Sequence, residues 1–280
     1  MTWFFLALLS TFFFTLYALL ARILSVKSKN PRAFSLVYNF FCSLFVLGLW
    51  LIEGESLKPI TPFVIFLTFI AITLWGLFNR VEYFAHKYME VSLRTIISKT
   101  AELTTFFAAT LFLREVMTFK KLLAVSLIVG ASVFALYKKN KIIKTKGLIY
   151  TLLTSIFLGL AWTMDKKVSV YYPTSFYVLL GYSLASLYII PFPTLSFNTV
   201  KKEFKRANWK VVLLAFINVL GYYTLIKSFA YGEASKIVLI VASRSVFTIL
   251  AGIVILKEKS NIFKKIMAGL IVSLGILLLK

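Results

Sequence analysis

The second half of this chain repeats its first half, and each half contains an odd number of hydrophobic segments. Residues 113–115 (Leu-Arg-Glu) correspond to residues 256–258 (Leu-Lys-Glu), and the two halves run in register without a gap from Glu90 and Glu233 to these motifs. With five hydrophobic spans in each copy, the second copy enters a membrane from the opposite side. The sequence therefore predicts an inverted repeat, the usual architecture for alternating access across a membrane.

The hydrophobic segments are long enough to cross a bilayer as helices, which takes about 20 apolar residues each. Of the 280 residues, 60% are hydrophobic and 15% are charged, and the mean hydropathy is +0.88. The apolar runs predict ten transmembrane helices at residues 2–24, 34–52, 61–80, 93–113, 119–137, 147–164, 174–193, 209–229, 235–256 and 262–279. We therefore expect an all-α integral membrane protein of two inverted five-helix repeats, residues 1–140 and 141–280.

The formal net charge of +22 does not indicate a nucleic-acid-binding surface, because almost all lysines lie at the ends of the predicted spans. Basic residues in such positions contact anionic lipid headgroups and fix the orientation of the helices. We expect membrane lipids and a small-molecule substrate as partners, no nucleic acid, and a monomer or homodimer in the cell (inner) membrane. The single cysteine, Cys42, lies inside a span and excludes an intrachain disulfide.

The charges of the connections give an orientation. The connections after odd-numbered spans hold most of the basic residues, including Lys27, Lys29, Arg32, Lys87, the five lysines of residues 138–146, Lys201, Lys202, Lys205, Arg206, Lys210, Lys257, Lys259, Lys264 and Lys265. The positive-inside rule places these connections in the cytoplasm and both termini outside.

The repeated architecture resembles the drug/metabolite transporter superfamily, and within it the EamA-type members. The elements that carry the resemblance are the two copies ending LFLREVMTFKKLLAVSLIVGASVFAL (residues 111–136) and VILKEKSNIFKKIMAGLIVSLGILLL (residues 254–279). Family members often have a proline thirteen residues before the Glu of this motif, where this chain has Glu102 and Ser245. The family is usually drawn with cytoplasmic termini, opposite to the loop charges, so the orientation stays open.

The resemblance implies that the fourth helix of each repeat lines a central cavity. The first of these helices contains Lys99 and Glu102, three residues apart and so on one face of a helix, and the second contains Arg244 near its middle. Ionisable side chains at membrane depth are costly and normally face a partner, water or a binding site. Two cations converging on one cavity suit a carboxylate or a phosphate group. Glu102 could bind a substrate ammonium, carry a coupling proton or simply neutralise Lys99.

Further candidates come from the other helices. Glu82 and Lys227 occupy equivalent positions near the ends of the third helices, where solvated side chains are the more common interpretation; Glu82 is also a candidate for proton coupling. The predicted cavity contacts of hydrogen-bonding or aromatic character are Asn79, Asn218, Tyr222, Tyr17 and Trp162, with helix packing as the alternative for each. His86 is expected at the surface, and Asp165, followed by two lysines, at a polar helix end.

No sequence motif points to catalysis. The chain has no GxxxxGK[ST] loop for ATP, no Cys/His metal cluster and no nucleophile beside a base, so we expect no enzyme activity, no cofactor and no metal. The sequence favours a secondary active transporter, an exporter or exchanger of an amino acid or organic anion, coupled to protons through Glu102 or Glu82. A phosphorylated-metabolite exchanger and an anionic lipid flippase are the alternatives.

Overall fold

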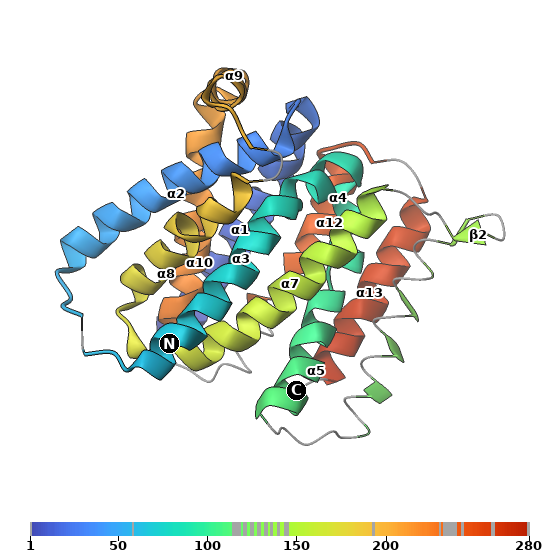
Figure 1. Ribbon diagram of the computed structural model, residues 1–280. Helices are drawn as coiled ribbons and strands as arrows, with labels where there is room; N and C mark the ends of the chain where they lie inside the picture. The colour runs from blue at the N-terminus through green and yellow to red at the C-terminus, as the bar shows by residue number, and fades with distance from the viewer. Residues whose placement is uncertain are drawn as a thin grey trace.

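The computed structural model of the chain is built almost entirely from α-helices (Figure 1). It describes residues 2–57, 59–113, 119, 122–123, 126–127, 130–131, 134, 137–138, 141–142, 146–191, 194–229, 231, 240–241, 244–258 and 261–278. The helices of the first half are α1 (Thr2–Lys27), α2 (Pro31–Glu53), α3 (Pro62–Tyr88), α4 (Val91–Ile97) and α5 (Thr100–Leu113). A short antiparallel pair, β1 (Tyr137–Lys138) and β2 (Lys141–Ile142), follows between the halves.

The second half contains a similar series of helices. These are α7 (Lys146–Val168), the 3₁₀ helix η1 (Ser169–Tyr171), α8 (Thr174–Ser183), the 3₁₀ helix η2 (Ala185–Ile189), α9 (Phe197–Ala207), α10 (Lys210–Phe229), α12 (Arg244–Val254) and α13 (Ile262–Leu278). The predicted single span at 174–193 is therefore an α-helix that tightens into a 3₁₀ helix.

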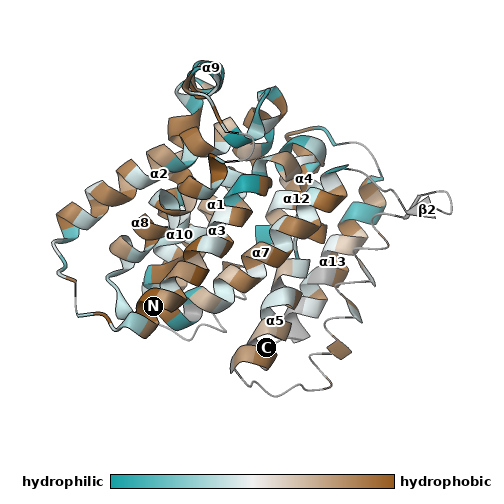
Figure 2. Cartoon of the chain, in the orientation of Figure 1, coloured by the Kyte–Doolittle hydropathy of each residue, from teal (hydrophilic) through white to brown (hydrophobic). Residues whose placement is uncertain are grey.

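Five helices in the described part of the chain are long and apolar enough to cross a membrane. They cover Thr2–Lys27, Pro31–Glu53, Pro62–Tyr88, Lys146–Asp165 and Lys210–Ser228, and coincide with five of the predicted spans. Most of predicted span 119–137 and the first part of 235–256 lie outside the described residues, so the number of ten helices stays a prediction. Hydrophobic residues lie along most of the helices (Figure 2). Large apolar side chains such as Phe5 and Phe63 are exposed on the surface, as expected for a chain surrounded by lipid.

Residue-level signals explain where α2 and α3 begin. The side chain of Asn30 accepts a hydrogen bond from the backbone N–H of Ala33, and the Thr61 hydroxyl accepts one from Val64. A proline follows each cap directly, at the first helical position, where its missing N–H leaves no bond unmade. Gly54 ends α2 with a φ of 62°, a left-handed conformation that favours glycine.

The predicted span 93–113 is not one continuous helix. The chain turns at Ser98 and Lys99, which separate α4 from α5. The Ser98 hydroxyl donates to the Thr95 carbonyl oxygen and the Thr100 hydroxyl to that of Ile97, so side chains here compete with the regular helical bonding. Lys99 and Glu102 therefore do not share one uninterrupted helix, and Lys99 occupies the turn.

The connection between η2 and α10 forms an unexpected helix, α9. Its exposed surface combines basic residues with Phe197 and Phe204, and the Phe204 ring stacks on Phe41 of α2. Glu203, buried beneath α9, accepts hydrogen bonds from the Ser28 hydroxyl and from the backbone N–H of Asn30. This carboxylate thus fixes α9 to the connection between α1 and α2.

Three of the connections that follow odd-numbered spans lie at one end of the bundle. Figure 1 shows the α1–α2 and α3–α4 connections and α9 at its upper end, and both termini at the lower end. These three basic connections therefore lie on one side, whereas most of the connection at residues 138–146 lies outside the described residues. Which side of a membrane this end faces stays a prediction.

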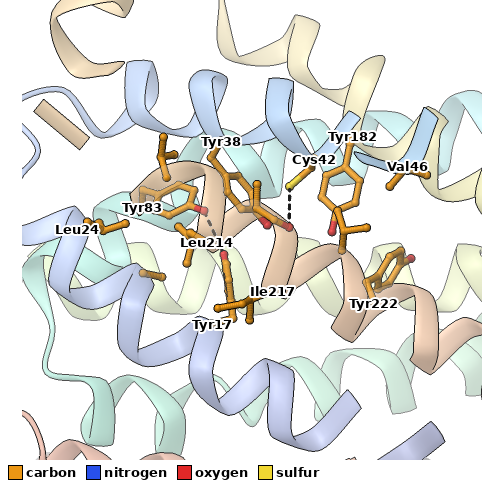
Figure 3. Close-up of a cluster of buried hydrophobic side chains, with 14 of the residues drawn as sticks. Tyr17, Leu24, Tyr38, Cys42, Val46, Tyr83, Tyr182, Leu214, Ile217 and Tyr222 are labelled. Carbon is orange, nitrogen blue, oxygen red and sulfur yellow. Dashed lines mark hydrogen bonds between the residues drawn. The ribbon is translucent and has the colours of Figure 1, made fainter. Parts of the chain in front are cut away.

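The main core lies between α1, α2, α3, α8 and α10, and it is rich in tyrosine (Figure 3). The rings of Tyr38 and Tyr83 meet edge to face with centroids 5.3 Å apart, and the Tyr17 hydroxyl lies 3.3 Å from that of Tyr83. Buried tyrosines need partners for their hydroxyl groups. This core therefore places polar atoms in the middle of the bundle.

Candidate functional site

A cavity of about 140 Å³ lies between α1, α2, α3, α4, α7, α8, α10 and α12, so both halves of the chain form its walls. Of the residues predicted to contact a substrate, those that line it are Lys99, Arg244, Asn79, Asn218, Tyr222, Tyr17 and Trp162, and Glu82 lines it as well. The side chain of Glu102 lies outside the described residues. The structure thus brings predicted positions from five helices and the α4–α5 turn to one place.

Glu82 lies inside the bundle because α3 continues to Tyr88, beyond the predicted end at residue 80. Its Oε1 accepts a hydrogen bond of 2.8 Å from the Tyr17 hydroxyl. Arg94 approaches the same oxygen to 3.6 Å and His86 Nε2 to 3.5 Å. We call these four residues the Glu82 cluster. Its carboxylate is buried and paired with a cation, so the interpretation of Glu82 as a solvated span-end residue is wrong.

The expectation of a surface position for His86 is also wrong, since this side chain is 0% exposed. Its ring packs against Tyr17 and Tyr83, with centroids 5.9 and 5.8 Å apart. Neither ring nitrogen makes a hydrogen bond to any described residue. His86 therefore fills the core beside Glu82.

Arg94 is a cavity residue that the sequence analysis did not single out. It lies on α4, within the predicted span 93–113, and its position at membrane depth is the signal that could have identified it. Lys99 follows at the turn after α4 and is only 3% exposed. The guanidinium carbon of Arg244, at the start of α12, lies 4.8 Å from the centre of the Phe14 ring, a cation–π contact.

The charges around the cavity are unequal. Among the described residues that line it, three are cationic (Arg94, Lys99 and Arg244) and one is acidic (Glu82). In an environment with few water molecules, such an excess attracts an anionic group far more strongly than it does in bulk water. The described lining therefore suits an anion.

Asp165 does not form the polar helix end that the sequence indicated. α7 continues past it to Val168, and the side chain is buried, with 5% exposed. Trp75 Nε1 donates to Asp165 Oδ1 at 3.0 Å, the Tyr222 hydroxyl donates to Oδ2 at 2.8 Å, and the Tyr177 hydroxyl donates to Oδ1. We call these four residues the Asp165 cluster. It joins α3 of the first half to three helices of the second half.

Asp165 has a different kind of partner from Glu82. All three of its hydrogen-bond donors are neutral, and no described Lys, Arg or His nitrogen forms an ion pair with it. Trp75, Tyr177 and Tyr222 all line the cavity, whereas Asp165 lies directly behind them. Its carboxylate is therefore separated from the cavity by one layer of aromatic side chains.

Two asparagines complete the polar lining. Asn218 Nδ2 donates to the Tyr182 hydroxyl at 2.6 Å and also to the Tyr38 hydroxyl. The Nδ2 of Asn79 is buried and makes no hydrogen bond to the described residues, which leaves a donor at the cavity wall. A buried donor without a partner is costly, and a bound ligand with an acceptor atom relieves this cost.

Comparison with known proteins gives a family for both halves. The model of the EamA-like transporter family matches residues 1–137 and again residues 145–280. No curated protein matches the chain. One solved structure, titled only "Crystal structure of protein", has a TM-score of 0.61 and 12% sequence identity, covering 99% of this chain and 96% of that chain. This likeness shows a shared fold over nearly the whole length of both proteins.

Proposed function

This chain belongs to the EamA-like transporter family of the drug/metabolite transporter superfamily, and from this membership we propose that it is a secondary active transporter of a small anionic metabolite. It is an exporter or exchanger that carries its substrate through the cavity by alternating access. The observation that supports this proposal is the convergence of Arg94, Lys99 and Arg244 on one cavity lined by both halves.

An amino acid or related organic anion fits this lining. The cations receive the carboxylate, with Arg244 able to make two parallel hydrogen bonds and Lys99 acting as a point charge. Glu82 is an acidic group in the same wall and can face a substrate ammonium. The predicted role of Glu102 toward the ammonium or a coupling proton stays a prediction.

A phosphorylated metabolite is the second candidate substrate. The excess of cations over carboxylates in the described lining favours it, because a phosphate group carries more than one negative charge at neutral pH. An anionic lipid headgroup shares this chemistry, so a lipid flippase is a further outcome for the experiment to separate.

Counterflow in proteoliposomes tests the proposal. A panel of labelled amino acids, organic acids and phosphate esters identifies the substrate, and a fluorescent anionic phospholipid tests for flipping. Lys99→Ala and Arg244→Ala each remove a charge-assisted contact and should raise KM by at least about tenfold. Lys202→Ala, on the exposed surface of α9, is the matched control and should leave KM unchanged.

Two results contradict the anion site. Transport of an anion that is unaffected by Lys99→Ala and Arg244→Ala removes these residues from the binding site. Lipid flipping without transport of any member of the soluble panel replaces the proposed metabolite transporter by a flippase.

The family and the apolar helices make the chain a multi-pass membrane protein. We propose the cell (inner) membrane as its location, with the basic connections at the upper end of Figure 1 in the cytoplasm. Cysteine accessibility from either side of intact cells, measured at exposed Lys202 and Phe63 after replacement by Cys, tests this orientation.

A further inference from the structure

Asp165 is a buried carboxylate with an unusual set of partners for a membrane helix. Its three donors come from α3, α8 and α10, and each of them is neutral. On its own helix, Lys167 is exposed and the side chain of Lys166 lies outside the described residues. No described cation is paired with this carboxylate.

A carboxylate in this position can exist in two forms with the same neighbours. When ionised, it accepts hydrogen bonds from Trp75, Tyr177 and Tyr222. When protonated, it can still accept from Trp75 and one tyrosine while it donates to the other tyrosine, because a phenolic oxygen also accepts hydrogen bonds. Burial with no described cation beside it favours the neutral form, and the three described donors favour the ionised form.

Glu82 differs from Asp165 because a described cation lies beside its carboxylate. Arg94 lies 3.6 Å from its Oε1, and the Tyr17 hydroxyl donates to the same oxygen. Removing the charge of Glu82 leaves the Arg94 guanidinium in the bundle without its ion-pair partner, which is costly. The Glu82 carboxylate is therefore paired with a cation, whereas no described cation is paired with Asp165.

We infer that Asp165, rather than Glu82, binds the coupling proton of the transport cycle, an inference that rests on the proposed function. In the loading step, a hydronium ion on one side of the membrane loses an O–H bond and remains as water, and its proton forms an O–H bond at a carboxylate oxygen of Asp165. In the release step, this bond breaks and the proton passes to water on the other side.

The aromatic layer links this proton to the substrate. Trp75 and Tyr222 both line the cavity and donate to Asp165. A substrate that accepts a hydrogen bond from either residue withdraws a donor from the carboxylate, and this loss favours protonation. Substrate and proton therefore stabilise each other's binding, and this linkage couples the two in the transport cycle.

Infrared difference spectroscopy tests proton binding without any substrate. The full chain in lipid nanodiscs is titrated between about pH 5 and about pH 8, and the C=O stretch of a protonated carboxyl group is recorded. This band should appear at the acidic end in the wild type, disappear in Asp165→Asn and persist in Glu82→Gln. A band that survives Asp165→Asn, or the absence of any band in the wild type, overturns the inference.

Two further variants keep the test decisive if Asp165→Asn does not fold. Tyr222→Phe and Tyr177→Phe each remove one donor from the ionised carboxylate while keeping the ring. Each should move the midpoint of the infrared titration to higher pH. Tyr172→Phe, which removes a hydroxyl paired with Thr68 instead, is the matched control and should leave the midpoint in place. Equal midpoints in all three variants overturn the inference.

Transport measurements separate this inference from the proposed function. With a substrate found by counterflow, Asp165→Asn should abolish accumulation driven by a pH gradient and keep substrate exchange within about twofold of the wild type. Loss of gradient-driven accumulation in Glu102→Gln with retention in Asp165→Asn overturns the inference. If the wild type transports no member of the panel, the proposed function fails, and the infrared titration still decides whether Asp165 binds a proton.

Discussion

The Glu82 cluster and the Asp165 cluster border the same cavity but neutralise their carboxylates in opposite ways. Glu82, on α3, lies beside the Arg94 guanidinium and accepts a hydrogen bond from one tyrosine. Asp165, on α7, accepts hydrogen bonds from one tryptophan and two tyrosines and has no described cation beside it. α3 and α7 pack closely against each other, so the two carboxylates lie on one pair of packed helices.

This difference separates two roles that a buried carboxylate can have. A carboxylate paired with a cation is fixed in charge, because neither member can be neutralised without leaving the other unpaired in a low-dielectric environment. A carboxylate held by neutral donors can gain a proton while its neighbours adjust. Of the two carboxylates beside this cavity, Glu82 therefore has a cation as a partner, and Asp165 has only neutral donors among the described residues.

The largest expected loss of stability comes from removing the cation of the Glu82 cluster. Arg94→Met leaves the Glu82 carboxylate buried without its cation and should lower the free energy of unfolding by about 3 kcal/mol or more. Adding Glu82→Gln removes the stranded charge and should recover part of this loss. Denaturant unfolding in detergent micelles measures both variants, with Lys201→Met on the exposed surface of α9 as control. Equal stabilities of the single and double variants contradict the ion pair.

Neutralising each of the two carboxylates in turn should have an intermediate effect on the free energy of unfolding. Glu82→Gln leaves Arg94 without its partner and should lower the free energy of unfolding by about 2 kcal/mol, since a charge-assisted contact is lost. Asp165→Asn leaves no charge unpaired and should cost less, about 1 kcal/mol, for one misplaced donor. The same unfolding measurement checks both. The reverse order shows that Asp165, and not Glu82, carries the fixed charge.

The smallest expected effect concerns the donors of the Asp165 cluster. Tyr177→Phe removes one neutral hydrogen bond to Asp165 and should lower the free energy of unfolding by about 1 kcal/mol. Tyr172→Phe removes the contact with Thr68 and should cost a similar amount. Only Tyr177→Phe should change the pH dependence of transport, which a series of counterflow rates measures. Identical pH profiles of the two variants show that the Tyr177 hydroxyl has a purely structural role.

Much of the site was predictable because charged residues inside apolar spans are rare and costly. This rule singled out Lys99 and Arg244, which line the cavity, and Glu102, whose side chain lies outside the described residues. Applied to Arg94, it would have found a further cation of the same lining. The repeat then suggested which helices meet. The same reasoning was wrong for Asp165 and His86, because each lies near a predicted span end beside lysine, where a residue facing water and a residue facing the core have the same local pattern.

The turn at Ser98 and Lys99 shows another limit of prediction. Residues 93–113 contain no proline or glycine, and their apolar character predicts one continuous helix. The break depends on hydroxyl groups that bond to nearby backbone carbonyl groups, which Ser and Thr do in some helices and not in others. Whether residues 93–113 form one continuous helix or two helices with a turn between them therefore depends on the tertiary packing around the turn.

The sequence by itself determined that this chain is a duplicated bundle of membrane helices with cations at depth, because span length, hydropathy and repeated motifs are properties of neighbouring residues. Only the tertiary structure decided which charges are paired. Glu82 meets Tyr17 and Asp165 meets Trp75 across 65 and 90 residues of chain. Such partners depend on how helices from distant segments pack, and this packing gives two similar carboxylates opposite electrostatic surroundings.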